Sequence, residues 1–283
     1  MSTDHPTDAT PPADPPCHPR IALMGEFSAG KSTLANLLLG HAISPVKVTA
    51  TQLPPIWYRG GRSRMTRIDM NGAEQPITAE DLTTLSHRDA QAVCVSLSAD
   101  VLEFCELIDM PGTSDPNLPE DIWERMIEHV DGVVWCTPAT QAWRQTEATL
   151  WESLPDRLRE RSLLLITRID KIASEADRAR ILTRVRHETD GLFKAVLPIS
   201  LTAAAAAGED MAALDASGAD AFIASLLEMV EPLEAPRTGT VTFAASTRAQ
   251  DAPEPRTGAE GIQPRRIALR RDPRGAAYAQ PGA

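Results

Sequence analysis

The chain has 283 residues, of which 42% are hydrophobic, and its 28 Lys and Arg against 39 Asp and Glu give a net charge of −11. This length and apolar content predict one good-sized domain with tails, or two small domains. The acidic balance argues against DNA, or an anionic membrane, as the partner of the body of the chain.

The four cysteines show no C-x-x-C pair and no metal-ligand spacing, and Cys94, Cys105 and Cys136 fall inside expected strands as small buried hydrophobes. No apolar run approaches about 18 residues, so the sequence predicts no transmembrane helix. The first residues lack the basic and apolar regions of a secretory signal. We therefore expect a cytoplasmic protein, with peripheral association with a membrane left open.

Both ends of the chain have the composition of disordered segments. Residues 1–19 are rich in Pro, Thr and Asp, and residues 233–283 in Pro, Ala and Arg, with no persistent apolar period. The second segment carries the pairs Arg265-Arg266 and Arg270-Arg271, which form a small basic patch. A solvated tail and a transient contact with lipid headgroups or an acidic partner are both open.

Between these segments, the patterns predict strands that alternate with helices. After a first strand over 20–24, strands are expected over 56–58, 64–70, 92–96, 104–108, 132–136, 162–167 and 195–200. Helices are expected over 33–39, from Thr78, and over 119–129, 144–153, 174–187 and 219–230. The strands at 56–58 and 64–70 are expected to form a hairpin joined by Gly60-Gly61. This alternation predicts one α/β domain over 20–232 with a mostly parallel sheet.

The stretch from Gly25 to Ser32 fits the phosphate-loop pattern G-x-x-x-x-G-K-[ST] at every fixed position, between an expected strand and an expected helix. It consists of Gly25, Glu26, Phe27, Ser28, Ala29, Gly30, Lys31 and Ser32, with Thr33 next. Such a loop wraps a phosphate so that its N–H groups point inward at the positive end of the helix. Lys31 is expected to reach the β- and γ-phosphates, and the Ser32 hydroxyl to ligate Mg²⁺. The alternative is a chance glycine turn before a helix.

Two further segments complete the expected phosphate and metal site. Asp109-Met-Pro-Gly112 follows a buried strand, so Asp109 is expected at the carboxyl edge of the sheet, where it can hold Mg²⁺ through water. The Gly112 N–H can meet the γ-phosphate. Thr51 lies in a stretch without helix or strand signal, and its hydroxyl can complete the Mg²⁺ shell while its backbone holds the attacking water. Thr49 could take the same role.

The segment Thr167-Arg-Ile-Asp170 comes at the end of another apolar strand and bears on the choice of base. The Asp170 carboxylate can accept hydrogen bonds from N1–H and the N2 amine of guanine, and adenine has neither donor there. Bound adenine would leave a buried charge unpaired, which points to GTP. The alternative is that Asp170 only N-caps a helix beginning at Lys171.

Together these residues resemble the translation-factor-like P-loop GTPases, and among them the bacterial dynamin-like branch. The resemblance covers roughly residues 20–232 and rests on motifs at 25–40, 45–55, 107–113, 167–170 and 198–200. It implies a three-layer P-loop NTPase G domain of the α/β class, with a mostly parallel sheet and helices on both faces. It also implies binding of GTP or GDP with Mg²⁺, Mg²⁺-dependent hydrolysis of the β–γ bond, and nucleotide-dependent pairing of two G domains, with K⁺ open as a further cofactor.

The resemblance also assigns roles to individual residues. The nucleotide-binding set is the phosphate loop with Thr33, together with Thr167, Arg168, Asp170, Ser200 and Leu201, where the backbone around Ser200 touches the O6 edge of guanine. The implied metal ligands are Ser32, Thr51 and Asp109, and the implied catalytic residues are Lys31, Ser28, Thr51 and Gly112.

Three positions depart from the pattern of the family. Arg168 replaces the usual lysine packed over the base, where a guanidinium plane can also stack. Phe27 replaces the glutamine of eukaryotic dynamins, and Thr113 follows Gly112 where Ras-like proteins keep a water-positioning glutamine. No side chain is an obvious base, so we expect slow unassisted turnover. Ser28 keeps the small polar residue that orients water and a monovalent cation in dynamins.

These features predict a dynamin-like G domain without a stalk, which binds GTP, hydrolyses it slowly and acts as a nucleotide switch. Residues 233–283 are too few for the long helical stalk of dynamin-like proteins. A nucleotide-regulated adaptor for a membrane-associated or ribosome-assembly partner, with hydrolysis only as a timer, is open as an alternative. A ribosome-assembly GTPase and an ATP-using P-loop enzyme are also open.

Overall fold

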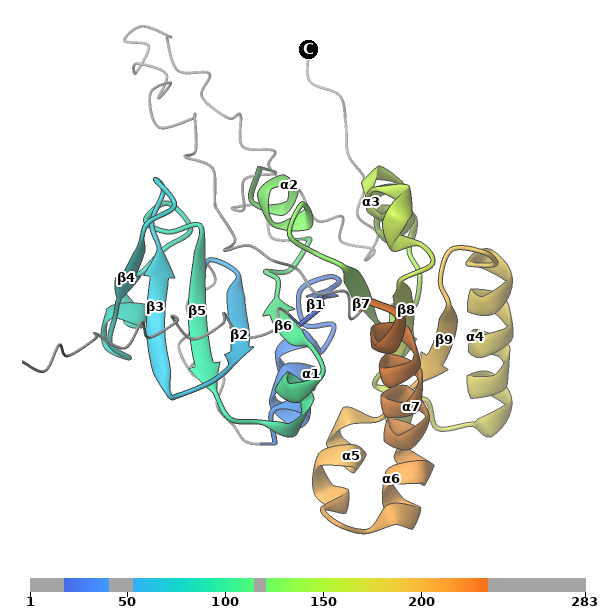
Figure 1. Ribbon diagram of the computed structural model, residues 1–283. Coiled ribbons are helices and arrows are strands. Elements are labelled where there is room, and N and C mark those ends of the chain that lie inside the picture. Colours follow the sequence, from blue (N-terminus) through green and yellow to red (C-terminus); the bar gives the residue numbers. More distant parts are fainter. Residues whose placement is uncertain (1–17, 41–52, 115–120, 234–283) are drawn as a thin grey trace, which may run out of the picture. The chain divides into compact units, whose positions relative to one another are not determined.

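The centre of the computed structural model, which describes residues 18–40, 53–114 and 121–233, is a nine-stranded sheet (Figure 1). Its strands are β1 (Arg20–Met24), β2 (Ile56–Gly60), β3 (Arg64–Ile68), β4 (Glu74–Pro76), β5 (Ala92–Leu97), β6 (Glu106–Asp109), β7 (Gly132–Pro138), β8 (Ser162–Thr167) and β9 (Ala195–Pro198). They lie in the order β4-β3-β5-β2-β6-β1-β7-β8-β9. Most neighbours are parallel, while β2–β6, β3–β4 and β3–β5 are antiparallel. The predicted mostly parallel sheet is confirmed.

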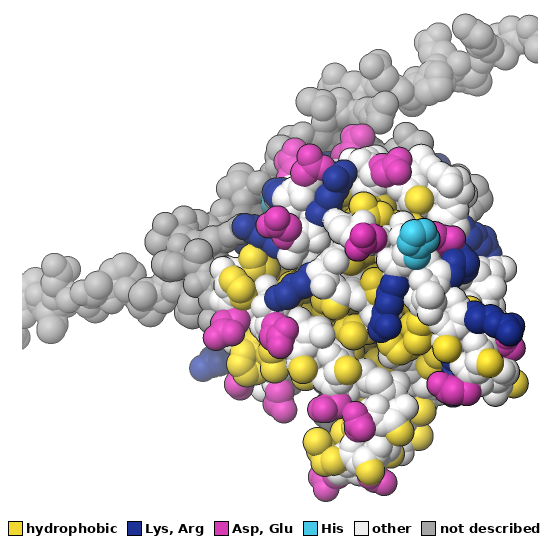
Figure 2. Space-filling model, turned by 90° about the vertical axis from the view of Figure 1, so that its right-hand side faces the viewer, with side chains coloured by type: hydrophobic (Ala, Val, Ile, Leu, Met, Phe, Trp, Pro, Cys, Tyr) yellow, Lys and Arg dark blue, Asp and Glu magenta, His cyan; other side chains and the backbone are white. Residues whose placement is uncertain are grey.

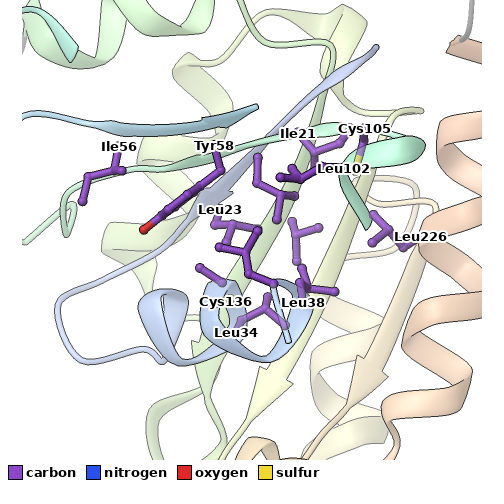
Figure 3. Close-up of a cluster of buried hydrophobic side chains, with 14 of the residues drawn as sticks. Ile21, Leu23, Leu34, Leu38, Ile56, Tyr58, Leu102, Cys105, Cys136 and Leu226 are labelled. Atoms are coloured by element: carbon purple, nitrogen blue, oxygen red, sulfur yellow. The ribbon is translucent and has the colours of Figure 1, made fainter. Parts of the chain in front are cut away.

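Helices cover both faces of this sheet. They are α1 (Lys31–Leu38), α2 (Asp121–Ile127), α3 (Gln145–Ser153), α4 (Glu175–Glu188), α5 (Leu201–Ala207), α6 (Met211–Ser217) and α7 (Ala219–Val230). Strand side chains alternate between the faces: Ile21 and Leu23 pack with α1, α5 and α7, and Ala22 and Met24 pack with α2, α3 and α4. Figure 3 shows the cluster on the α1 side of the sheet, where side chains of β1 and α1 pack together. The three-layer arrangement predicted from the sequence is therefore confirmed.

The central strands are buried on both faces, which explains why the sequence pattern located them well. β1, β8 and α7 have the predicted bounds, and β8 has no exposed residue. The expectation of buried cysteines also holds for Cys94, Cys105 and Cys136, and burial raises the pKa of each thiol to about 12. Cys17 lies outside the described residues.

The predicted hairpin of β2 and β3 is wrong, because β5 lies between these two strands. β2 pairs with β5 in parallel and β3 pairs with β5 in antiparallel orientation. The glycine turn after β2 instead crosses the end of β5, where the Gly61 N–H donates to the Leu97 carbonyl at 3.1 Å. Five of the six residues of β5 are buried, but only two of the five in β3, so the more apolar strand takes the interior place.

Several other boundaries differ from the prediction. The helix expected from Thr78 is only a short 3₁₀ turn over Asp81–Thr83, beside which the Thr78 N–H donates to the Asp81 carboxylate at 2.7 Å. The strand expected over 104–108 begins two residues later, because the Cys105 N–H closes a turn on Val101. The prediction also missed β4 and the helices α5 and α6. The tails predicted over 1–19 and 233–283 lie almost entirely outside the described residues.

The side of the domain that carries α4 mixes charges of both signs (Figure 2). Arginines of α4 pair with acidic side chains one turn away, as in Arg180–Asp177 at 3.0 Å and Arg184–Glu188 at 2.8 Å. Among the helices of the described ranges, none is both long and apolar enough to cross a bilayer.

The sheet brings the predicted motifs to one edge. β6, β7 and β8 run parallel to β1 or to its parallel neighbour, and β9 runs parallel to β8. The carboxyl ends of these strands therefore lie at the same edge of the sheet. The phosphate loop, Asp109, Thr167 and Ser200 all follow or end these strands, so residues far apart in sequence share one edge.

Candidate nucleotide-binding site

The phosphate loop connects β1 to α1 and is closely fitted to its surroundings. Gly25 has φ of +132°, and a Cβ atom there would lie 2.1 Å from the Cys136 carbonyl oxygen of β7. Only glycine fits that position. α1 begins at Lys31, so the N–H groups of its first turn, which have no helical partners, face the loop. This geometry is the one a phosphate-binding loop requires.

Lys31 is buried beneath the loop. Its Nζ donates to the carbonyl oxygens of Gly25 at 3.0 Å and Glu26 at 2.9 Å. Burial lowers the pKa of Lys31, and the nearby Asp109 carboxylate opposes that shift. The ammonium is thus held by backbone oxygens in a place where a phosphate would be a strong partner.

Asp109 ends β6 and is also buried, at 7% exposure. Burial raises the pKa of its carboxyl group, while the charge of Lys31 and a hydrogen bond with the Ser32 side chain oppose the shift. Its Oδ1 has no hydrogen-bond partner among the described residues. A buried carboxylate oxygen without a partner is costly unless something binds it.

Ser32 and Asp109 fit a magnesium ion. Both offer oxygen atoms, and the described residues contain no cluster of three or more His, Cys, Asp or Glu that would hold a metal without help. Mg²⁺ commonly takes one or two protein oxygens and fills its remaining positions with waters and substrate phosphates. The donors at this edge therefore suit a metal that arrives with a phosphorylated ligand.

The segment after Asp109 packs directly on the phosphate loop. A Cβ atom on Gly112 would lie 2.9 Å from the backbone of Phe27, so this close approach requires glycine. The Thr113 N–H donates to the Gly25 carbonyl at 3.2 Å, and the Phe27 N–H donates to the Ser114 hydroxyl at 3.0 Å. The sequence contained no signal for the contact made by Ser114.

Thr167 and Arg168 hold the phosphate loop from the end of β8. The buried Thr167 hydroxyl donates to the Ala29 carbonyl at 2.7 Å. Arg168 has φ of +56°, and its Nη2 donates to the Ser28 carbonyl at 2.6 Å. Both side chains thus contact the loop backbone, which fixes the loop to the segment predicted to read the base.

Asp170 is held by two residues that follow it in the sequence, its neighbour Lys171 and the more distant Ser200. The Ser200 hydroxyl donates to its Oδ1 at 2.9 Å, and Lys171 Nζ lies 3.6 Å from its Oδ2. The alternative that Asp170 caps a helix at Lys171 is wrong, because α4 begins at Glu175 with Ser174 as its N-cap. Ser200 itself caps α5, so α5 and the Asp170 side chain share one anchor.

A cavity of about 370 Å³ lies over this edge. Its lining includes Phe27, Ser28, Gly30, Lys31, Ser32, Thr33, Asp109, Gly112 and Arg168, all predicted from the sequence, and also Leu53, Pro54, Ile56, Met110 and Pro111. Seven residues of the predicted nucleotide-binding set lie outside this lining, and they are Gly25, Glu26, Ala29, Thr167, Asp170, Ser200 and Leu201. Thr49 and Thr51 lie outside the described residues. Lys31, Ser32 and Asp109, which are expected to hold phosphate and Mg²⁺, therefore meet in one cavity, and Asp170 follows two residues after Arg168 of its lining.

Comparison with known proteins identifies the family. Residues 21–169 match the model of the dynamin family. The chain belongs to this family. Dynamin-like protein 2 of Campylobacter jejuni is 24% identical over 161 residues, which are 55% of this chain and 26% of that protein. The isoniazid-induced protein IniC of Mycobacterium tuberculosis is 35% identical over 125 residues, which are 40% of this chain and 25% of that protein. The chain spans about a quarter of the length of these relatives.

The fold is also that of a bacterial dynamin. An oligomerised bacterial dynamin pair, described as a mechanism for long-range sensing and tethering of membranes, superposes with a TM-score of 0.59 and 18% identity. The match covers 75% of this chain and 44% of that one. Together with the family match, this shows that the chain contains a dynamin-like G domain.

Replacing Thr167 with valine tests whether this side chain holds the loop. Valine keeps the shape but leaves the buried Ala29 carbonyl without its donor, so we expect a loss of about 1–3 kcal/mol in the free energy of unfolding, measured with urea. Thr183→Val is the matched control, because that exposed hydroxyl also donates to a helix carbonyl, of Ala179 at 2.9 Å. An equally small effect of both variants would show that Thr167 does not hold the loop.

Proposed function

We propose that this G domain binds GTP with Mg²⁺ and hydrolyses it slowly, so that the bound nucleotide acts as a switch. The observation that carries the proposal is the presence, in one cavity, of the buried Lys31 ammonium and the buried Asp109 carboxylate with its unpartnered Oδ1 among the described residues. A buried cation beside a loop of backbone amides favours a polyphosphate, and a free carboxylate oxygen favours a hydrated cation.

In the proposed reaction, the loop amides and Lys31 stabilise the negative charge that grows on the β–γ bridge oxygen. Bound at Ser32 and near Asp109, Mg²⁺ would supply charge neutralisation at the β- and γ-phosphates. Thr51 and the backbone around Gly112 would orient the attacking water, and Ser28 would do so together with K⁺. Asp109 is the one acidic residue of the described cavity lining, and no histidine lines it, which supports slow unassisted turnover.

We infer that the base is guanine. The Ser200 hydroxyl fixes one oxygen of Asp170 at 2.9 Å, which orients a carboxylate toward paired donors such as N1–H and the N2 amine. Arg168, bonded to the Ser28 carbonyl, would lay its side-chain stem over the base while its guanidinium stays on the loop. Leu201, buried beside Gly30, would support the loop from the guanine side.

The boundaries and partners of the domain follow as further parts of the proposal. We assign the G domain to residues 20–232 of a cytoplasmic protein that associates peripherally with membranes, and we infer that two copies pair across the nucleotide face. The fold shared with a bacterial dynamin pair that senses and tethers membranes supports this assignment. A nucleotide-regulated adaptor for such a membrane partner is the second candidate, and a pull-down that compares GTP-loaded with GDP-loaded protein distinguishes the two.

Lys31→Ala tests the phosphate site. The variant removes two or more charge-assisted contacts with the phosphates, each worth about 1.5–3 kcal/mol, so we expect GTP affinity to fall by at least about a hundredfold and turnover to be lost. Titration of a fluorescent GTP analogue measures the affinity. Lys194→Ala, which removes a surface lysine that donates to the Glu228 carbonyl, is the control and should bind normally. GTP binding and turnover retained in Lys31→Ala would contradict the assignment.

Asp170→Asn tests the choice of base. An amide presents a donor where guanine also presents one, whereas xanthine offers an acceptor, so we expect preference to shift toward xanthosine triphosphate by about tenfold or more. Competition of GTP and xanthosine triphosphate for the same fluorescent analogue measures the shift. Asp177→Asn on α4 is the control for the charge change. Unaltered selectivity for GTP in Asp170→Asn would remove Asp170 from this role.

A further inference from the structure

The side chain of Glu26, a residue of the phosphate loop, is held by Arg144 and Thr146 at the start of α3. Its Oε1 accepts a hydrogen bond from the Thr146 hydroxyl at 3.0 Å, and its Oε2 lies 3.3 Å from Arg144 Nη1. The residue is buried, at 8% exposure, and does not line the nucleotide cavity. Glu26 therefore contacts residues more than 110 positions away in sequence rather than the ligand site.

The backbone of the same residue holds the lysine of the loop. The Glu26 carbonyl accepts from Lys31 Nζ at 2.9 Å and from the Ala29 N–H at 3.2 Å. A rotation of the Glu26 peptide would therefore move the acceptor that holds the ammonium. The side chain holds this peptide at its Glu26 end, and the Phe27 N–H of the same peptide donates to the Ser114 hydroxyl at 3.0 Å and holds its other end.

The start of α3, which holds Glu26, makes buried hydrogen bonds of its own. The buried Glu147 carboxylate accepts from Trp135 Nε1 at 2.9 Å, the Thr137 hydroxyl at 3.0 Å and the Arg144 N–H at 3.0 Å. The Trp143 N–H donates to the same Thr137 hydroxyl at 3.1 Å, and Trp143 is held at φ of +57°. Since Trp135 and Thr137 belong to β7, the start of α3 is fixed to the central sheet.

We propose that Glu26 is a positioning residue for the GTPase: its carboxylate, held by Arg144 and Thr146, fixes the carbonyl that aims Lys31 at the phosphates. The inference deepens the proposed function and rests on it. Without the contacts of Glu26 with Arg144 and Thr146, the Glu26 peptide samples more orientations, and the loop must be ordered when the nucleotide binds. Small displacements of a group that stabilises a transition state lower the rate strongly.

A structural role alone would have a different signature. The Arg144 side chain is 43% exposed, so its ion pair with Glu26 contributes little to stability by itself, and loss of the carboxylate would destabilise mainly by leaving the Thr146 hydroxyl without its acceptor. The proposal instead requires that GTP affinity and turnover change while the protein stays folded. Glu74 provides a matched comparison, because it also pairs with an arginine and a threonine, Arg59 at 3.0 Å and Thr66 at 2.6 Å, on the far strands of the sheet.

The test compares Glu26→Ala, Glu26→Gln and Glu74→Ala in the full chain, with a fluorescent GTP analogue and steady-state turnover in saturating Mg²⁺. We expect Glu26→Ala to bind GTP about tenfold more weakly and to lose kcat further at saturating GTP. Glu26→Gln keeps an oxygen that can accept from Thr146 and should recover most of both losses. Glu74→Ala should match the wild type in affinity and kcat, whatever its melting temperature.

A second set of variants keeps the test decisive if Glu26→Ala does not fold. Arg144→Ala combined with Thr146→Val removes both contacts of the Glu26 carboxylate without changing the loop itself, and it should reproduce the loss of affinity. Wild-type values of affinity and kcat in that double variant, or in folded Glu26→Ala, would overturn the inference and leave the proposed function standing. Failure of the wild type itself to bind GTP would overturn both.

Discussion

Two opposite charges buried at the carboxyl edge of the sheet, the Lys31 ammonium and the Asp109 carboxylate, are the constraint on which this domain depends. Burial lowers the pKa of the first and raises that of the second, and each charge partly offsets the shift of the other. Lys31 is satisfied by two backbone carbonyls, whereas Asp109 keeps an oxygen without a partner in the described part of the chain. Burying charges in this way costs free energy, which the binding of a triphosphate and its metal would offset.

The fold holds the phosphate loop from several sides before any ligand arrives. The wall of β7 leaves room only for glycine at position 25, and Thr167 from β8 holds the Ala29 carbonyl. Arg168 donates to the neighbouring Ser28 carbonyl, and Thr146 at the start of α3 donates to the Glu26 carboxylate. Because the donors and acceptors are fixed in advance, little reorganisation is left for the moment of binding or reaction. This preorganisation links the parallel sheet to the proposed chemistry.

The sequence was sufficient to predict local motifs and strands that are buried on both faces of the sheet. It was insufficient to predict features that depend on contacts between distant residues. A fixed spacing of glycines, lysine and serine located the phosphate loop, and an unbroken apolar run located β8 with its bounds. The order of the strands could not be predicted, because β5 lies between β2 and β3, and neither β2 nor β3 specifies by its own sequence that it pairs with β5. The contact of Glu26 with Thr146 spans 120 positions, so no spacing rule could indicate it. The alanine-rich α5 was missed although Ser200 caps it, since its apolar period is weak.

The most direct test of the account is a competition titration of the wild-type protein, in which GTP and ATP displace a fluorescent guanine nucleotide in the presence of Mg²⁺. A site that holds a triphosphate at Lys31 and reads guanine at Asp170 predicts displacement by GTP at concentrations at least about a hundredfold lower than by ATP. Equal displacement by the two nucleotides, or displacement by neither, would contradict the account.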